Sequence, residues 1–271
     1  MVPDILALDF DGVCCDGMRE YFETSRHTHA QVWAAEPIPA ADHLAAFAAL
    51  RPVIHSGWEM PVLLRAIAHG RTRAEILASW ETVREQVVAG GLGPALIELI
   101  GRTLDRVRRE WIARDAAGWL DLHAPYGALD DLRRLVTEPA RAVLVTTKEG
   151  EFARLVLERW NVRLADVQGK ETGVHKCLNL RGLIDAWVAA HGRRPRLVFV
   201  EDRLETLQHV TTHPDLDDVT LFLAAWGYNT ETARATAAAD PRIRLLTLEQ
   251  FRRGTAAWVP PRASRADTRA H

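Results

Sequence analysis

The second half of the chain alternates between strand-like and helix-like segments. Apolar runs typical of buried strands occupy residues 142–147, 196–202, 219–226 and 243–248, and segments with helical spacing lie between them. An earlier apolar run at residues 4–8 ends abruptly at the sequence DFDG. Repeated strand–helix units predict a parallel sheet with helices on both faces, which is the α/β fold class.

Residues 18–118 follow a different pattern. Apolar residues recur there at helical spacing, for example Ile76, Trp80 and Val83, and Pro94 is well placed to begin another helix. We therefore expect an all-helical insertion at 18–118 within a core formed by 1–17 and 119–254. The segment 255–271 is rich in Arg, Pro and Ala, and we expect it to be a flexible tail.

Composition excludes several classes of function. The formal net charge of −2 over 271 residues gives no electrostatic footprint for nucleic acid or an anionic membrane. No apolar run approaches the ~18 residues of a membrane span, and acidic residues interrupt the N-terminal apolar stretch of a would-be signal peptide. The three cysteines, Cys14, Cys15 and Cys177, lack zinc-finger spacing, which favours reduced thiols in the cytoplasm. The oligomeric state stays open.

Acidic residues follow two of the predicted strands. Asp9 and Asp11 come after the first strand, and residues two apart on a strand face the same way. Glu201 and Asp202 close the strand RLVFVED, where paired carboxylates suit a hard cation. Taken singly, each site also fits an ordinary acidic turn.

Two further sites involve a hydroxyl and a lysine. Thr146 lies at the end of the strand AVLVTT, and its hydroxyl is suited to donate to a phosphoryl oxygen. Thr147 is the alternative, and a purely structural role for Thr146 would be that of a helix N-cap. Lys176 lies at the start of a predicted helix and is the candidate cation for a phosphate and the acids, with Lys170 as the alternative. Without such a role, a lysine is ordinarily found on the surface. All four sites lie at C-terminal strand ends of one sheet, where open parallel sheets bind ligands.

In this order the sequence resembles the haloacid dehalogenase (HAD) superfamily. DFDGV matches its first signature, VLVTTK the second, the Lys176 segment the third and VFVED the fourth. The resemblance implies a three-layer Rossmannoid core with a movable C1-type cap, near the phosphoglycolate phosphatase and β-phosphoglucomutase branch. The sequence departs from that branch in its long cap and in Arg203, where a small residue is common.

The resemblance also implies roles for the residues. Asp9 is the expected nucleophile and Asp11 the general acid/base, while Thr146 and Lys176 bind phosphate. Mg²⁺ is the expected cofactor, held by Asp9, the backbone of Asp11 and Asp202, with Glu201 assisting. The expected reaction is hydrolysis of a small phosphorylated metabolite through an aspartyl-phosphate.

Two alternatives remain at this point. A phosphomutase of the β-phosphoglucomutase kind uses the same residues but needs a second phosphate site, for which the cap offers Arg19, Arg65, Arg71 and Arg73 without a compact basic cluster. A non-catalytic binding or regulatory protein is disfavoured, because clustered buried carboxylates are costly without a cation.

Overall fold

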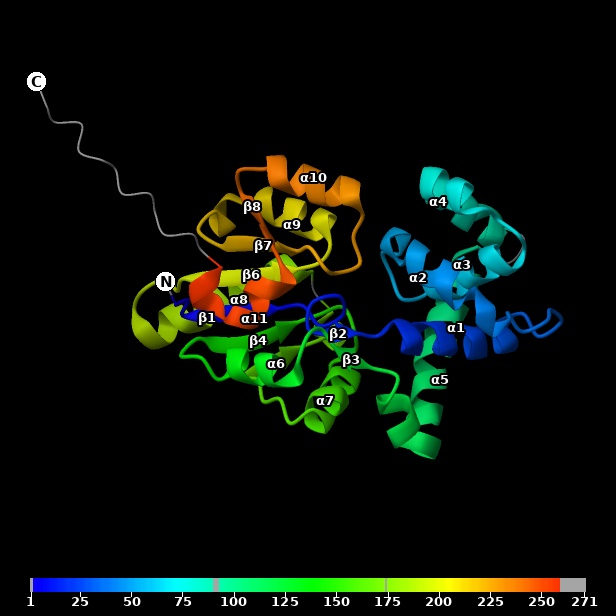
Figure 1. The fold of residues 1–271 in the computed structure, drawn as a ribbon, viewed down its shortest axis with the longest axis horizontal. Helices are drawn as coiled ribbons and strands as arrows, with labels where there is room; N and C mark the ends of the chain where they lie inside the picture. The colour runs from blue at the N-terminus through cyan, green and yellow to red at the C-terminus, as the bar shows by residue number, and fades with distance from the viewer. Residues whose placement is uncertain (1, 90–92, 174, 259–271) are drawn as a thin grey trace, which may run out of the picture.

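A parallel sheet forms the centre of the molecule. The computed structural model describes residues 2–89, 93–173 and 175–258, and within these ranges six strands pair in the order β5-β4-β1-β6-β7-β8 (Figure 1). β1 pairs in parallel with both β4 and β6, so its C-terminal end is the switch point where such sheets bind ligands. The strands are β1 (Ile5–Leu8), β4 (Arg141–Val145), β5 (Asp166–Gln168), β6 (Leu197–Glu201), β7 (Thr220–Ala224) and β8 (Ile243–Leu246).

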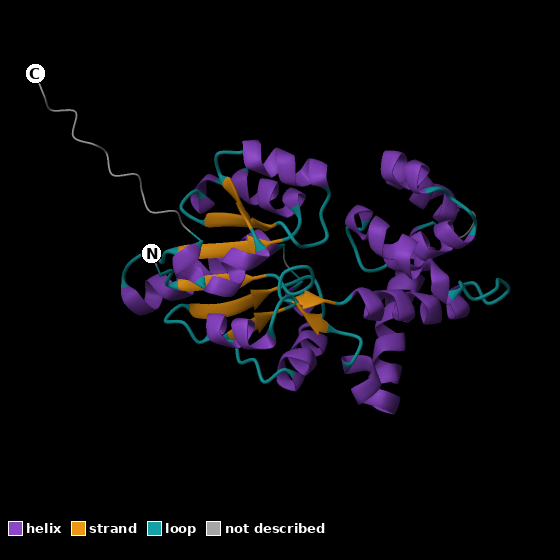
Figure 2. Cartoon of the chain, in the orientation of Figure 1, coloured by secondary structure: helices purple, strands orange, loops and turns teal. Residues whose placement is uncertain are grey.

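Helices cover both faces of this sheet and give it three layers (Figure 2). Leu183 of α8 and Leu207 of α9 join the apolar cluster on one face. Phe152 of α7 and Phe251 of α11 join the cluster on the other face. The helices are α6 (Leu129–Val136), α7 (Gly150–Arg159), α8 (Lys176–His191), α9 (Leu204–Thr211), α10 (Glu231–Ala239) and α11 (Leu248–Arg253).

A second group of helices lies beside the sheet and is inserted between β1 and β4 (Figure 1). It has its own apolar cluster, which includes Phe22, Phe47, Leu63 and Ile100. The small antiparallel hairpin of β2 (Cys15–Asp16) and β3 (Ala124–Pro125) lies at the entry and exit of this insertion. The helices are α1 (Met18–Val32), α2 (Leu44–Leu50), α3 (Glu59–Ala68), α4 (Arg73–Ala89) and α5 (Pro94–Leu120).

The α/β class, the parallel sheet and the helical insertion after the first strand are confirmed. The insertion limits of 18–118 stay a proposal, because α5 continues to Leu120 and Trp119 is fully buried among residues of the sheet part. The expectation of a flexible tail from residue 255 is wrong at its start. Thr255–Ala257 form a short 3₁₀ helix, and Trp258 is buried because its ring stacks on Phe251 and donates to the Gln250 carbonyl. Residues 259–271 lie outside the described ranges.

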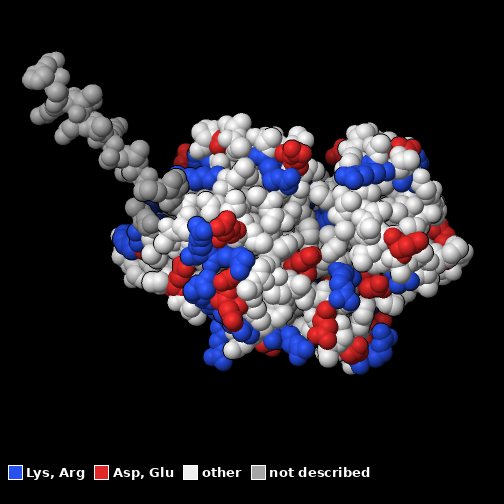
Figure 3. All heavy atoms as spheres, in the orientation of Figure 1, with Lys and Arg blue, Asp and Glu red and all other residues white. Residues whose placement is uncertain are grey.

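The surface carries both signs of charge. On the face shown in Figure 3, acidic and basic side chains are interspersed over both parts of the molecule. None of the helices in the described ranges combines the length and the apolar composition needed to cross a bilayer.

Candidate active site

Asp9 directly follows β1, and the sheet determines where its carboxylate lies. The Asp9 N–H still donates to the Val200 carbonyl at 2.9 Å, which keeps the residue in register with β6. Its Oδ1 accepts from the Phe10 N–H at 2.8 Å, and the residue is only 6% exposed. Burial and the charge of Glu201 raise the pKa of Asp9 to about 7, against the lowering effect of Lys176. A buried carboxylate with a raised pKa at a switch point is typical of a functional site.

Asp11 lies two residues further and lines the same cavity as Asp9. Its Oδ1 has no hydrogen-bond partner among the described residues. Gly12 follows with a backbone φ of +85°, which residues other than glycine rarely adopt. A Cβ atom at this position would lie only 2.1 Å from Asp202 Oδ2. The glycine of DFDG is therefore needed both for the turn and for the close approach of Asp202.

Glu201 and Asp202 complete a cluster of three buried acids. One carboxylate oxygen from each of Asp9, Glu201 and Asp202 lies within 4.8 Å of the other two. Burial and the charge of Asp9 raise the pKa of Asp202 to about 6, and burial likewise raises the pKa of Glu201. Asp202 Oδ2 accepts from the Tyr228 N–H at 2.8 Å, so the segment after β7 holds its orientation.

Lys176 is the cation of this cluster. Its Nζ lies 3.0 Å from Asp9 Oδ2 and 2.6 Å from Glu201 Oε2. Burial favours the neutral amine, but the charges of Asp9 and Glu201 outweigh it and raise the Lys176 pKa. The alternative, Lys170, is exposed and pairs with Asp105 of α5 at 2.8 Å. The structure brings Lys176, and not Lys170, to the acids.

Thr146 directly follows β4 and is buried, whereas Thr147 is exposed. The Thr146 N–H donates to the Gln168 carbonyl at 3.0 Å, and its Oγ1 accepts from the Lys148 N–H at 3.1 Å. The helix N-cap explanation does not apply to Thr146, since α7 begins only at Gly150. Both threonines line the cavity that contains Asp9.

Lys148 is a second buried cation that the sequence reasoning did not single out. Its side chain is 3% exposed, and its Nζ lies 3.6 Å from Asp11 Oδ1 and 3.6 Å from Glu20 Oε2. This Nζ has no hydrogen-bond partner among the described residues. The signal was present in VTTK itself, where a lysine directly follows the two threonines at the end of a predicted strand.

The helical insertion contributes Arg51 to the cavity. Its guanidinium lies 5.2 Å from the ring centroid of Tyr21 and 4.7 Å from that of Tyr228. Nη1 donates to the Ile54 carbonyl at 3.3 Å, but the buried Nε has no partner among the described residues. Buried arginines are usually paired, so an Arg51 guanidinium with an unpartnered donor beside this cavity is a candidate for contact with a ligand.

The four cap arginines considered from the sequence lie elsewhere. Arg65 is bound by the Glu36 carboxylate and the Val87 carbonyl. The cap arginines that line the Asp9 cavity, among the described residues, are Arg51 and Arg108. The cavity lining does not include Arg19, Arg65, Arg71 or Arg73.

Arg108 of α5 is occupied by a buried ion pair at the base of the insertion. Its Nε and Nη2 donate to the two carboxylate oxygens of Glu20 at 2.7 and 3.0 Å. Burial opposes the charged form of Glu20, but the charges of Arg108 and Lys148 outweigh it and hold its pKa below the usual range. The bidentate geometry favours a role in holding α1 to α5.

Arg203 connects the end of β6 to the insertion. Its Nη1 donates to the Ile54 carbonyl, and its Nη2 lies 2.9 Å from His55 Nδ1. Arg203, which departs from the family pattern, therefore touches the cap.

The cavity between the sheet part and the helical insertion has a volume of about 310 Å³, within the range of small-molecule sites.

The acid cluster fits a hard divalent cation. Three buried carboxylates face a single hydrogen-bonded ammonium, and burial, together with the charges of the neighbouring acids, raises the pKa values of Asp9 and Asp202. Both oxygens of Glu201 are already engaged, by Lys176 Nζ and by the Arg203 N–H at 3.1 Å. Asp9 is engaged in the same way, by the Phe10 N–H and by Lys176 Nζ, whereas Asp202 accepts at Oδ2 from the Tyr228 N–H. A carboxylate oxygen has more than one lone pair, so Asp9 and Asp202, with Glu201 assisting, would hold a hard cation such as Mg²⁺.

Comparison with solved structures identifies the fold of the chain. No protein-family model matches the chain, and no curated protein sequence matches it significantly. Solved structures do match. A candidate phosphoglycolate phosphatase from Lactobacillus delbrueckii subsp. bulgaricus is 15% identical with a TM-score of 0.62, over 96% of this chain and 100% of that one. The haloacid dehalogenase-like hydrolase SP0104 from Streptococcus pneumoniae is 12% identical with a TM-score of 0.55, over 91% and 95%.

The chain has a haloacid dehalogenase-like fold. Protein Tyrosine Kinase A from Mycobacterium tuberculosis shares it, with 19% identity and a TM-score of 0.57 over 95% of this chain and 99% of that one. The names of these proteins include both a hydrolase and a kinase. Since one fold supports several reactions, the reaction of this HAD-like chain has to be argued from its own residues.

Proposed function

We propose that the protein is a Mg²⁺-dependent phosphomonoester hydrolase in which Asp9 is the nucleophile. The observation that carries the proposal is the position of the Asp9 carboxylate. It is buried at the switch point of the sheet, 3.0 Å from Lys176 and beside the carboxylates of Glu201 and Asp202. A small phosphorylated metabolite is the substrate class that suits a cavity of about 310 Å³ lined by both acids and cations.

Charge explains why such a site accepts a phosphate. A phosphomonoester carries roughly two negative charges near neutral pH, as protein-bound phosphates do, and repels a carboxylate. Mg²⁺ held by Asp9 and Asp202 would supply positive charge that offsets this repulsion. Lys176 neutralises part of the charge of Asp9, and Thr146 lines the cavity with a hydroxyl that is suited to donate to a phosphoryl oxygen.

The reaction then takes two steps. An oxygen of Asp9 forms a bond to phosphorus while the ester oxygen–phosphorus bond breaks, and Asp11 gives its proton to the leaving alkoxide. Asp11 next takes a proton from water as the water oxygen attacks phosphorus, which releases inorganic phosphate and restores Asp9. Lys148, 3.6 Å from Asp11 Oδ1, is placed to keep that carboxylate oriented toward the cavity.

The arginines of the cap favour plain hydrolysis over mutase action, because they do not form a second phosphate site. A mutase must hold a second phosphate, for which a bidentate arginine pair is well suited. Arg108 is already paired with both oxygens of Glu20, whereas, among the described residues, Arg51 is the other cap arginine that lines the cavity and has no acidic hydrogen-bond partner. One such arginine suits an anionic or polar leaving group better than a second phosphate dianion.

A substrate screen tests this proposal directly. Purified protein is incubated with sugar phosphates, phosphoglycolate and nucleotides, and phosphate release is measured with Mg²⁺, with Ca²⁺ and with EDTA. We expect release that requires Mg²⁺ and is weak with Ca²⁺, because few protein ligands suit a water-rich octahedral ion. Full activity after exhaustive chelation contradicts the proposal.

Phosphorus NMR separates the hydrolase from the mutase. The protein is supplied with β-glucose 1-phosphate and catalytic bisphosphate, and both products are followed. Faster formation of glucose 6-phosphate than of free phosphate would overturn the choice of hydrolysis.

A further inference from the structure

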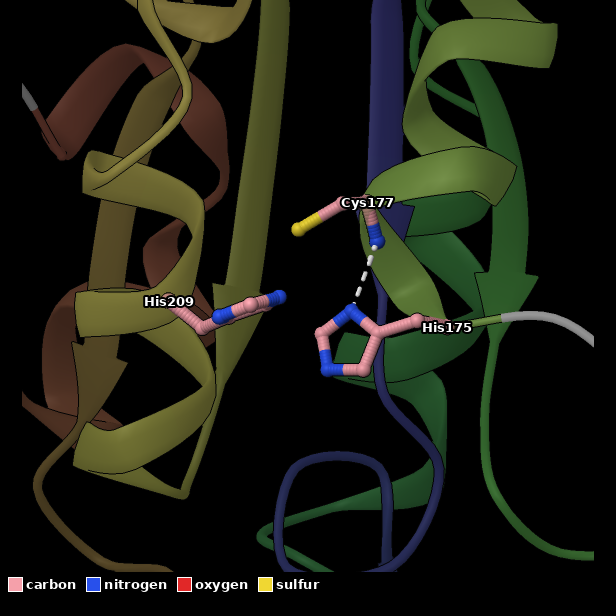
Figure 4. A group of neighbouring side chains, drawn as sticks. All are labelled: His175, Cys177 and His209. Carbon is pink, nitrogen blue, oxygen red and sulfur yellow. Dashed lines mark hydrogen bonds between the residues drawn. The ribbon is translucent and has the colours of Figure 1, made fainter.

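A second cluster of ligating side chains lies between α8 and α9, outside the acid cluster. His175, Cys177 and His209 each offer a ring nitrogen or sulfur atom, and these three atoms lie within 4.8 Å of one another. In Figure 4 the Cys177 sulfur and the His209 ring project toward each other from the two helices, and the His175 ring lies beside them. The two imidazole rings are close, with centroids 4.3 Å apart.

The fold holds these side chains on rigid supports. His175 is the N-cap of α8, Cys177 lies in its first turn, and His209 lies in the last turn of α9. The two helices share the apolar cluster on one face of the sheet, where Leu180 and Leu207 are buried. Ligands on packed helices keep their separation better than ligands on loops.

Local hydrogen bonding accounts for only part of the arrangement. His175 Nδ1 accepts from the Cys177 N–H at 3.3 Å, which is long for such a bond. His209 Nε2 lies 3.5 Å from His213 Nε2, at the limit of a hydrogen bond. Neither contact explains why a sulfur and two imidazoles from different helices converge on one point.

We propose that His175, Cys177 and His209 form a binding site for Zn²⁺, distinct from the carboxylate cluster that suits Mg²⁺. Thiolate and imidazole are the ligands that Zn²⁺ prefers, and three protein ligands leave a fourth tetrahedral position for water. Mg²⁺ prefers oxygen and does not compete for such a set.

The protonation states agree with this assignment. Burial and the neighbouring His209 lower the pKa of His175, so its ring is neutral near pH 7 and carries one lone pair, for which a metal competes only with the long hydrogen bond from the Cys177 N–H. Burial raises the pKa of Cys177, so without a metal the group is a thiol. On binding, a sulfur–metal bond replaces the sulfur–hydrogen bond, and the proton passes to solvent.

The test uses Co²⁺ as a visible substitute for Zn²⁺ on the full-length, metal-free protein in the presence of excess Mg²⁺. We expect a thiolate-to-cobalt charge-transfer band that saturates at one equivalent and disappears when Zn²⁺ is added. Cys177→Ser should remove the band. His209→Ala should weaken Co²⁺ binding by more than about 100-fold, beyond the loss caused by removing a supporting hydrogen bond.

Two controls keep the outcome decisive. His191→Ala changes an exposed histidine at the other end of α8, whose ring stacks on Trp187, and should bind Co²⁺ as the natural chain does. Zn²⁺ should also raise the melting temperature of the natural chain but not of His209→Ala, which alters an exposed side chain and should leave the fold intact. A cobalt band that persists in Cys177→Ser, or no band in the natural chain, overturns the proposal.

Discussion

The cavity has a sheet side, which includes Asp9 and Lys176, and a cap side, which includes Arg51, and the cations on the two sides differ in their partners. On the sheet side, Lys176 lies between Asp9 and Glu201 at 3.0 and 2.6 Å, so its charge is already shared. On the cap side, the Arg51 guanidinium packs against the rings of Tyr21 and Tyr228, and its Nε has no hydrogen-bond partner among the described residues. We infer that the sheet side performs the chemistry and the cap side selects the leaving group, and variants on each side should separate turnover from recognition.

The largest effect is expected for Asp9→Asn. Asparagine keeps the size of the side chain but is not a nucleophile, so kcat should fall by at least about 1,000-fold, as it does when a catalytic nucleophile is removed elsewhere. Circular dichroism should show an unchanged fold. The matched control is Asp130→Asn, since the Asp130 side chain is 86% exposed on α6, and it should leave kcat unchanged. Substantial turnover in purified Asp9→Asn would remove the nucleophile assignment.

A smaller but still large effect is expected for Lys176→Ala. The change leaves the buried carboxylates of Asp9 and Glu201 without their shared cation, so kcat/KM should fall by roughly 100-fold or more. Lys170→Ala is the control, because that exposed amine pairs with Asp105 away from the acids, and it should change kcat/KM by less than about twofold. If Lys170→Ala alone impairs turnover, the placement of the phosphate-side lysine is wrong.

The two sides also differ in how much the sequence predicts about them. Asp9 and Asp202 follow neighbouring parallel strands, and the geometry of a sheet brings such strand ends together wherever the helices lie. Arg51 lies in a short 3₁₀ helix whose direction depends on the packing of α2 and α3. The Glu20–Arg108 pair joins residues 88 apart in the sequence, and no local pattern indicates it. The arrangement of these cap residues is therefore set by tertiary packing.

On the cap side, Arg51→Gln should affect recognition more than chemistry. Glutamine fills similar space but removes the positive charge, so KM for substrates with an anionic leaving group should rise by roughly 10-fold, with a smaller change in kcat. Arg65→Gln is the matched control, since Arg65 is bound by Glu36 away from the cavity, and its KM should be unchanged. A fall in kcat as large as that of Asp9→Asn would show that the cap takes part in the chemistry.

The smallest effect is expected for Arg203→Ala, which removes a link between the two sides. Arg203 donates to the Ile54 carbonyl and contacts His55, so its loss frees this part of the cap from the end of β6. One or two such partly exposed hydrogen bonds contribute about 1 kcal/mol, which corresponds to a change of roughly fivefold in KM. Amide hydrogen exchange should increase at residues 52–58, whereas Arg181→Ala, which breaks a surface pair with Asp215 on the sheet part, should leave it unchanged. If exchange at 52–58 stays the same while kcat collapses, then Arg203 acts on the reacting groups and the division of labour between sheet and cap fails at this residue.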